Sequence, residues 1–387
     1  MGRAGELCRV SDPTLAASPV NWPVELRSDT FTLPTPVMLR AMSTAELGDD
    51  VYGEDPTVRM LEELSAEVLG KGAGCFMPTG TMANLASILT HCPRGSKVIV
   101  GEDSDIYVYE AGGASVCGGV VYHPVPNRPD GTIDLAAVAA AFPADEDDPQ
   151  FALPALLCLE NPQNHSGSHV LPLSYLASVA EFAAEKGLPV HLDGARVFNA
   201  ALAIGVPPAE IARHADSVQF CLSKGLGAPV GSMVVGTEAF VAGVRRVRKL
   251  LGGGMRQSGV LAAAGIVALR ERDRLAEDHA TARRLADALA AVPGIEVEPA
   301  EPRTNMVFFH ATGAGLTNAE LVARAAVGGV AIAELGGRIR AVTHQGVSIA
   351  DVDYAVEVIR QARADASGEN TEPTRSTHAS RGTALAR

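Results

Sequence analysis

The sequence predicts an α/β fold, with a large domain on a mostly parallel sheet and a smaller α+β domain after it. Short continuous apolar runs alternate with helical patterns, as expected when a parallel sheet is covered by helices on both faces. After Pro293 the pattern changes, because two apolar runs flank a single helix. The length of 387 residues, 47% of them hydrophobic, is enough for two domains of about 100–200 residues each.

The predicted strands of the large domain are apolar runs separated by helical patterns. In chain order they are Lys97–Val100, Val116–His123, Ala155–Glu160, Pro189–Leu192, Ser217–Cys221 and Ser232–Gly236. The predicted helices are Thr57–Leu69, Thr81–His91, Pro172–Lys186, Glu238–Leu250 and Gly259–Ala290. In the small domain the runs are Asn305–His310 and Arg338–Thr343, and the helix between them is Asn318–Ala326.

These elements predict a large domain over 26–272 and a small C-terminal domain over 273–366. Residues 1–25 lack clear periodicity and contain three prolines, which predicts a partly disordered arm. Residues 367–387 are rich in Ser, Thr, Gly, Glu and Arg, a composition typical of a disordered tail.

The net charge of −13 argues against nucleic acid or anionic lipid as a partner. One basic cluster stands out, and we interpret it as a solvated helix face or a subunit contact: Arg245, Arg246, Arg248 and Lys249. The six cysteines are scattered without a C-x-x-C pair, as in reduced cytosolic enzymes. No apolar run approaches the 18 residues of a membrane span, so we expect a cytoplasmic protein.

Lys224 has the most informative setting of the five lysines. It follows the predicted strand Ser217–Cys221 and begins the turn Lys224-Gly225-Leu226-Gly227. Ligands of α/β sheets bind at such strand ends. A partly desolvated lysine has a lowered pKa and can form an imine with a carbonyl group. The alternative is a surface lysine in a glycine-rich loop.

Two further segments supply what a pyridoxal 5′-phosphate (PLP) site requires. Gly80 and Thr81 open a predicted helix, whose free N–H groups and dipole favour a phosphate; the alternative is a simple N-cap. Asp193 ends an apolar strand, where a buried carboxylate would pair with a protonated pyridine nitrogen; the alternative is an ordinary Asp-Gly turn. Arg196 and Arg340 are candidates for a substrate carboxylate, or else for structural ion pairs.

Taken together, the motifs resemble the low-specificity L-threonine aldolases, PLP enzymes of fold type I, from about Leu26 to Asp353. The matching stretches include Gly48–Pro56, Gly80–Asn84, His191–Arg196, Leu222–Gly231 and Leu251–Gln257. The resemblance implies cleavage of a β-hydroxy-α-amino acid, such as L-threonine or L-allo-threonine, to glycine and an aldehyde. It also implies a homodimer or homotetramer with active sites at the interface, and no metal.

The resemblance implies a role for each matching residue. Lys224 would carry PLP as a Schiff base, and Asp193 would pair with the ring nitrogen. The remaining cofactor and substrate contacts would come from Gly80, Thr81, Arg256, Ser28, Tyr52, Arg196 and Arg340. Arg256 would reach the phosphate across a dimer interface, and Tyr52 would line the site.

The sequence departs from the family at two positions near the substrate. Asp105 stands where the family has a histidine stacked on the pyridine ring, and Gln163 replaces a second histidine. Glutamine cannot act as a general base near neutral pH. His165 lies two residues after Gln163, and it either substitutes for the missing histidine or is an ordinary loop or surface histidine. Three hypotheses follow: aldol cleavage, another PLP reaction such as β-elimination, transaldol transfer or β-substitution, and a non-enzymatic homologue. Intact Lys224 and Asp193 argue against the third.

Overall fold

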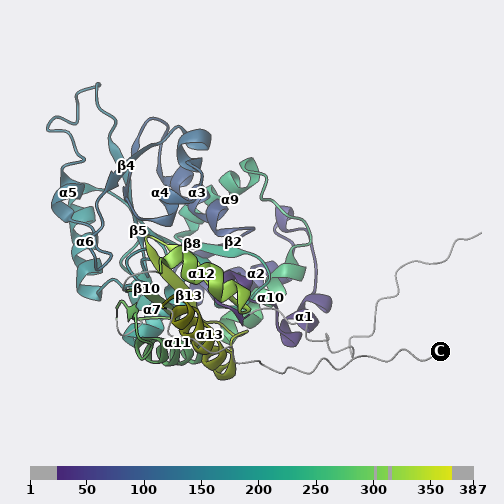
Figure 1. Ribbon diagram of the computed structural model, residues 1–387. Coiled ribbons are helices and arrows are strands. Elements are labelled where there is room, and N and C mark those ends of the chain that lie inside the picture. The colour runs from purple at the N-terminus through teal and green to yellow at the C-terminus, as the bar shows by residue number, and fades with distance from the viewer. Residues whose placement is uncertain (1–23, 300–302, 313–315, 368–387) are drawn as a thin grey trace, which may run out of the picture.

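A computed structural model describes residues 24–299, 303–312 and 316–367. Its centre is a seven-stranded sheet of order β2-β8-β7-β6-β5-β3-β4 (Figure 1). The strands are β2 (Ala73–Met77), β3 (Lys97–Gly101), β4 (Val121–Val125), β5 (Pro154–Glu160), β6 (Val190–Asp193), β7 (Ser217–Cys221) and β8 (Ser232–Gly236). β8 pairs antiparallel with both its neighbours, and the other pairings are parallel. The predicted mostly parallel α/β sheet is therefore confirmed.

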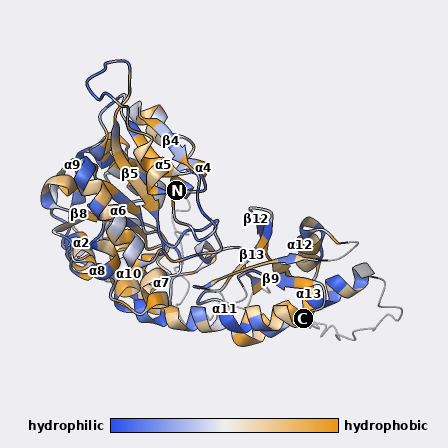
Figure 2. Cartoon of the chain, turned by 90° about the vertical axis from the view of Figure 1, so that its left-hand side faces the viewer, coloured by the Kyte–Doolittle hydropathy of each residue, from blue (hydrophilic) through white to orange (hydrophobic). Residues whose placement is uncertain are grey.

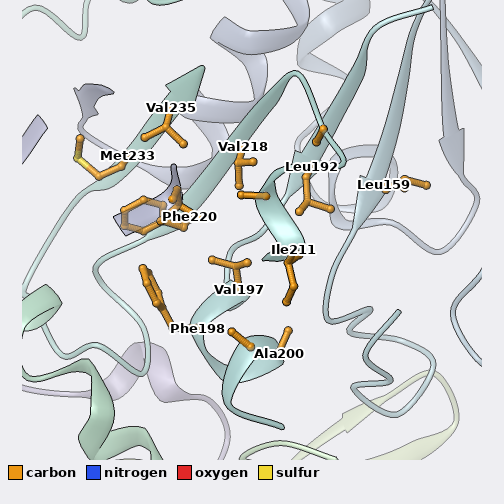
Figure 3. Close-up of a cluster of buried hydrophobic side chains, with 14 of the residues drawn as sticks. Leu159, Leu192, Val197, Phe198, Ala200, Ile211, Val218, Phe220, Met233 and Val235 are labelled. Carbon is orange, nitrogen blue, oxygen red and sulfur yellow. The ribbon is translucent and has the colours of Figure 1, made fainter. Parts of the chain in front are cut away.

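Helices cover both faces of this sheet because successive strand residues point to opposite sides. Leu157 and Leu159 of β5 belong to one core, and Leu156 and Cys158 belong to another. The first face is covered by α2 (Pro56–Leu69), α6 (Leu173–Lys186), α7 (Val197–Ile204), α8 (Pro208–Ala212) and α10 (Gly259–Arg270). The second is covered by α3 (Gly80–His91), α4 (Asp105–Val108) and α9 (Glu238–Leu250). Figure 3 shows Phe198 of α7 beside Phe220 of β7 in the first core.

The small domain is built on a four-stranded antiparallel sheet of order β12-β13-β10-β9. Its strands are β9 (Ile295–Val297), β10 (Met306–Ala311), β12 (Ala333–Leu335) and β13 (Arg338–Val342). Three helices pack with it: α11 (Leu275–Ala290), α12 (Asn318–Val327) and α13 (Ile349–Ser367). Figure 2 shows α11 extending from the large domain along the base of the small one.

Residues 24–32, here called the N-terminal segment, connect the two domains. Its strand β1 (Val24–Glu25) pairs parallel with β11 (Val330–Ala331) of the small domain. At its other end, the Thr32 hydroxyl donates to the backbone carbonyl of Lys224 in the large domain (3.0 Å). The segment is thus bonded to both domains.

Three predicted elements differ from the structure. The strand expected over Val116–His123 begins only at Val121, because Ala114–Gly118 forms a π-helical turn. The helix expected over Gly259–Ala290 is two helices, α10 and α11, separated by the 3-10 turn Arg272–Arg274. The arm expected over 1–25 ends in strand β1, while residues 1–23 and most of the predicted tail lie outside the described residues.

The basic cluster on α9 is only partly a solvated face. Arg248 is 4% exposed and forms an ion pair with Asp50 (2.9 Å). Arg245 forms a bidentate pair with Glu62 of α2 (2.9 and 2.6 Å). These two arginines therefore bind α9 to neighbouring elements of the large domain.

None of the helices in residues 24–299, 303–312 and 316–367 has the length and hydropathy of a membrane-spanning segment.

Candidate active site

The predicted site residues gather where the parallel strands end. Asp193 ends β6 and Glu160 ends β5, and the two are register partners on adjacent strands. Lys224 follows β7, the neighbour of β6 on its other side. The carboxyl ends of adjacent parallel strands meet at one edge of a sheet, so these side chains come from three neighbouring strands.

Asp193 is a buried carboxylate held by neutral groups. Its Oδ1 accepts from Gln219 Nε2 (2.7 Å) and the Ala195 N–H (3.0 Å), and its Oδ2 accepts from Asn84 Nδ2 (2.8 Å). No cation lies within ion-pair distance of it among the described residues. Burial raises its pKa, although the charge of Lys224 opposes this. A buried carboxylate that has neutral donors but no cation is complementary to a protonated pyridine nitrogen.

Lys224 lies among charged groups in a tight turn. Gly227 closes that turn with φ +83°, a conformation that favours glycine. Burial lowers the pKa of Lys224, but Cys221, Asp193 and Asp105 together outweigh burial and Arg196, and the pKa is raised. The prediction of a lowered pKa is therefore wrong, because the sequence did not reveal which groups surround the amine.

The N-terminus of α3 is shaped for close approach. Thr79 caps the helix by accepting from the Met82 N–H (3.1 Å), and Gly80 follows it. A Cβ on Gly80 would lie 2.9 Å from Cys221 Sγ, so a larger residue there would require the Cys221 side chain to move. Two buried oxygens near this point, Ser232 Oγ and Gln219 Oε1, have no protein partner among the described residues. Free N–H groups and a hydroxyl donor suit a phosphate, so the residues present fit PLP.

Arg196 is engaged by an aspartate of the N-terminal segment. Its Nε and one terminal nitrogen donate to the two oxygens of Asp29 (2.9 and 2.6 Å). Burial alone would raise the pKa of Asp29, but the charge and hydrogen bonds of Arg196 hold it well below its usual range. Both side chains are buried. The structural ion pair that the sequence left open is thus present, and a contact of Arg196 with substrate remains a prediction.

Arg340 projects from β13 of the small domain with one nitrogen unused. Its terminal nitrogens donate to Asn164 Oδ1 (3.0 Å) and to the Arg27 carbonyl (3.1 Å), whereas its buried Nε has no partner among the residues that the structure describes. No carboxylate pairs with it in the described part of the chain. Burial and the nearby charge of Arg196 lower its pKa. The partners of Arg340 in the described residues are therefore neutral oxygens, and the arginine could still bind an anion.

Asp105 begins α4 and is linked to Arg340 through an amide. Asn164 Nδ2 donates to Asp105 Oδ1 (3.3 Å), while its Oδ1 accepts from Arg340. Glu160 fixes the backbone of both Asp105 and Asn164, because its two oxygens accept from their N–H groups (2.7 and 2.8 Å). Burial raises the pKa of Glu160 well above its usual value, and Asp105 and Asp193 add to the shift.

Gln163 does not present its amide to this site. Its Nε2 donates to the Asp103 carbonyl (2.9 Å), and its Oε1 accepts from the Ser166 N–H (2.6 Å). The side chain is 1% exposed. Both ends of the amide are thus used to fold the 161–169 loop, and a role of Gln163 toward the substrate remains a prediction. His165 in that loop stacks on Tyr109 (5.4 Å between ring centroids).

Three other predicted contacts lie toward the surface. Ser28 caps a 3-10 turn of the N-terminal segment by accepting from the Thr30 N–H (3.2 Å). Tyr52 is 76% exposed, and Arg256 pairs with Asp49 on the same surface (2.9 Å). Within one chain, Tyr52 and Arg256 are therefore available to a neighbouring molecule, and their roles remain predictions.

Sequence reasoning missed three residues that shape the site. Asn84 and Asn164 each bridge two functional side chains, and Glu160 holds two backbone N–H groups. Glu160 carries the signal that identified Asp193, an acidic residue at the end of an apolar strand. Asn84 is a polar residue on the buried face of α3. A buried polar side chain needs a hydrogen-bond partner, and this need could have marked it as a site residue.

Comparison with known proteins finds relatives over most of the chain. The family model of the beta-eliminating lyases matches residues 25–312. Low-specificity L-threonine aldolase 1 of Arabidopsis thaliana is 46% identical over 343 residues, covering 88% of this chain and 96% of the relative. The low specificity L-threonine aldolase of Escherichia coli K12 is 49% identical over 286 residues, covering 74% and 84%.

Solved structures share the fold. A threonine aldolase of Leishmania major superposes with a TM-score of 0.75 at 23% identity, covering 88% of this chain and all of that one. A serine palmitoyltransferase of Sphingomonas wittichii superposes with a TM-score of 0.69 at 18% identity, covering 90% and 88%. At these identities the likeness concerns the fold, a mostly parallel sheet with a smaller C-terminal domain.

Proposed function

Because the chain belongs to the low-specificity L-threonine aldolase branch of the beta-eliminating lyase family, we propose that it breaks, or in reverse forms, the Cα–Cβ bond of a β-hydroxy-α-amino acid. L-threonine or L-allo-threonine would give glycine and an aldehyde. The protein is a PLP-dependent lyase. The observation that carries the proposal is the position of two buried groups on adjacent strands. Asp193 ends β6 and has no cationic partner among the described residues, and Lys224 follows β7.

Five groups would hold the cofactor. Lys224 would bind its aldehyde carbon, Asp193 its ring nitrogen, and Gly80, Thr81 and Ser232 its phosphate. When bound, PLP withdraws the electron pair that is released as the Cα–Cβ bond breaks. Asp193 supports this by keeping a negative charge beside the ring, while Asn84 and Gln219 fix the orientation of the carboxylate.

Arg340 would bind the substrate carboxylate, since its Nε is unused and no described residue is its anionic partner. Replacing Arg340 by leucine is expected to raise KM for L-threonine about 30- to 1000-fold, because a buried charge-assisted pair contributes about 2–4 kcal/mol. Steady-state kinetics measure this. Arg338→Leu, in the same strand, is the control, since its guanidinium lies over Phe308 (4.6 Å) and donates to the His165 carbonyl (2.5 Å). Equal effects of the two variants would contradict the assignment.

Asp105 would accept the β-hydroxyl proton, because its carboxylate can take up a proton whereas the Gln163 amide cannot. Asp105→Asn is expected to lower kcat for aldol cleavage about 100-fold or more, with the absorbance of the bound cofactor retained. The matched control is Asp103→Asn, two residues earlier and exposed, whose hydrogen bonds to Gln163 and Asn127 use the backbone carbonyl and N–H. A kcat within twofold of the wild type for Asp105→Asn would rule out this role.

Product analysis tests the reaction as a whole. The enzyme is incubated with the four threonine isomers and with phenylserine, and glycine and aldehyde are quantified together. Equal amounts of the two products are expected from L-threonine or L-allo-threonine. Ammonia and a keto acid in place of glycine would identify β-elimination instead, and absence of any turnover with a bound cofactor would point to a different substrate.

A homodimer or homotetramer in the cytoplasm is the assembly and location we propose. Exposed Tyr52 and Arg256, with exposed apolar side chains nearby on the N-terminal elements, support a partner at this surface. Five cysteines in the described part of the chain are free, four of them buried, which supports a reducing compartment; Cys8 lies outside the described residues. Sedimentation analysis of wild type and Tyr52→Glu would test the assembly.

A further inference from the structure

A chain of hydrogen bonds runs behind Asp193, away from the substrate side. His91, in the last turn of α3, places Nε2 2.9 Å from Ser217 Oγ. The same hydroxyl lies 2.9 Å from His191 Nδ1, and His191 Nε2 lies 3.1 Å from Asn84 Oδ1. Asn84 Nδ2 then donates to Asp193 Oδ2 (2.8 Å). Except for His91, these side chains are at most 3% exposed.

The direction of every donor in this chain can be worked out from its end. Asn84 Nδ2 donates both hydrogens, one to Asp193 and one to Glu110 Oε1 (2.8 Å), so Asn84 Oδ1 must accept. The opposite amide orientation would aim an oxygen at the Asp193 carboxylate. His191 Nε2 is therefore the donor to Asn84, and burial lowers the pKa of His191 to about 3, so the ring is neutral. Its Nδ1 accepts.

The two hydrogen bonds of Ser217 have the same direction. Ser217 must donate to His191 Nδ1, so its oxygen is free to accept from His91 Nε2–H. Burial also lowers the pKa of His91, to about 4, and its ring stacks on Phe240 (4.4 Å). All N–H and O–H groups of the chain thus point the same way. The hydroxyl of Ser217 fixes the tautomer of His191, and His191 fixes the amide of Asn84.

We propose that His91, Ser217, His191 and Asn84 are positioning residues, which form a one-way chain of donors that keeps Asp193 ionised beside the cofactor's ring nitrogen. The need is physical, because Glu110 and Glu160 lie near Asp193 and burial raises the pKa of all three. A donor directed at Asp193 stabilises its charged form over its protonated form. If this series of hydrogen bonds were broken, Asn84 could turn its amide oxygen toward the carboxyl groups of Glu110 and Asp193. That orientation would favour the protonated form of Asp193. This inference rests on the cofactor of the proposed function but not on its substrate.

The test measures the protonation of the ring nitrogen directly, by ¹⁵N NMR of enzyme loaded with ring-¹⁵N-labelled PLP, as a function of pH. Ser217→Ala and His191→Leu each remove two hydrogen bonds of this series. Each is expected to lower the ring-nitrogen protonation constant about 3- to 10-fold, which corresponds to the loss at Asp193 of one buried hydrogen bond worth roughly 1 kcal/mol. His191→Gln keeps a donor at the Nε2 position and is expected to restore the wild-type value. Ser87→Ala is the matched control, a fully buried serine of α3 whose hydroxyl bonds only Ala83 within its own helix.

Two results would overturn the inference. One is a wild-type ring-nitrogen equilibrium in both Ser217→Ala and His191→Leu together with lowered melting temperatures, which would make the chain purely structural. The other is the Nδ1–H tautomer at His191 in ¹⁵N-histidine-labelled enzyme, which would reverse the donor direction. Failure of wild-type protein to bind labelled PLP would instead refute the proposed function, so the two failures are distinguishable.

Discussion

Replacing Lys224 by alanine is expected to abolish the absorption band of lysine-bound PLP and to lower aldol cleavage by at least about 1000-fold. The amine supplies the covalent attachment, and no other lysine follows a strand at this edge of the sheet in the described part of the chain. The measurement combines a visible absorption spectrum with glycine release from L-threonine. Free PLP added to the variant is expected to absorb as unbound aldehyde.

The control for Lys224 is Lys186→Ala, at the exposed end of α6, where the ammonium lies over the Phe142 ring (5.1 Å). This variant is expected to keep both the band and the activity. A lysine-bound band that survives in Lys224→Ala would move the attachment to another lysine and refute the assignment of the site.

Asp29→Ala is expected to reduce the free energy of unfolding by about 3–5 kcal/mol. The substitution leaves the Arg196 guanidinium buried without its anion, and removing one partner of a buried ion pair has this effect. It also removes an acceptor of Asn305, which joins the small domain to the N-terminal segment (3.3 Å). Guanidinium unfolding followed by circular dichroism measures the loss.

The pH dependence of that loss has a definite sign. The pKa of Asp29 is lowered in the folded protein, so its stabilisation is complete above the unfolded value near about 4 and disappears as pH falls below it. The difference between wild type and Asp29→Ala is therefore expected to be constant from pH 5 to 8 and to shrink in acid. Asp353→Ala, which breaks the exposed pair with Arg284, should cost at most about 1 kcal/mol. A similar loss in both variants would contradict the argument.

Apolar runs predicted most elements of the fold closely, because a strand buried on both faces leaves a continuous signal. Ser217–Cys221 and Ser232–Gly236 have the predicted bounds. The break between α10 and α11 was missed because helical periodicity continues across it. What separates the two helices is tertiary, since α10 packs on α1 (Pro36–Ser43) and α2 in the large domain, whereas α11 packs on α13 in the small one.

The candidate site was predictable only where a residue's role follows from its position on a strand. Lys224 and Asp193 stand at strand ends, and the sheet topology brings them together. The orientation of a side chain depends instead on partners that are remote in sequence. Asp29 holds Arg196 across 167 residues, and the Asp103 carbonyl turns Gln163 away from the site across 60. No local pattern reports such partners.

The N-terminal segment also determines when a nascent chain can become active. Arg340 donates to the Arg27 carbonyl across 313 residues, and β1 has no partner until β11 exists. At about 5–20 residues per second, translation needs roughly 15–60 s between these segments. The residues of the N-terminal segment leave the ribosome early and are thus among the last to find their places. During synthesis they would be open to chaperones, and a chain truncated before β11 would carry Lys224 without a completed site.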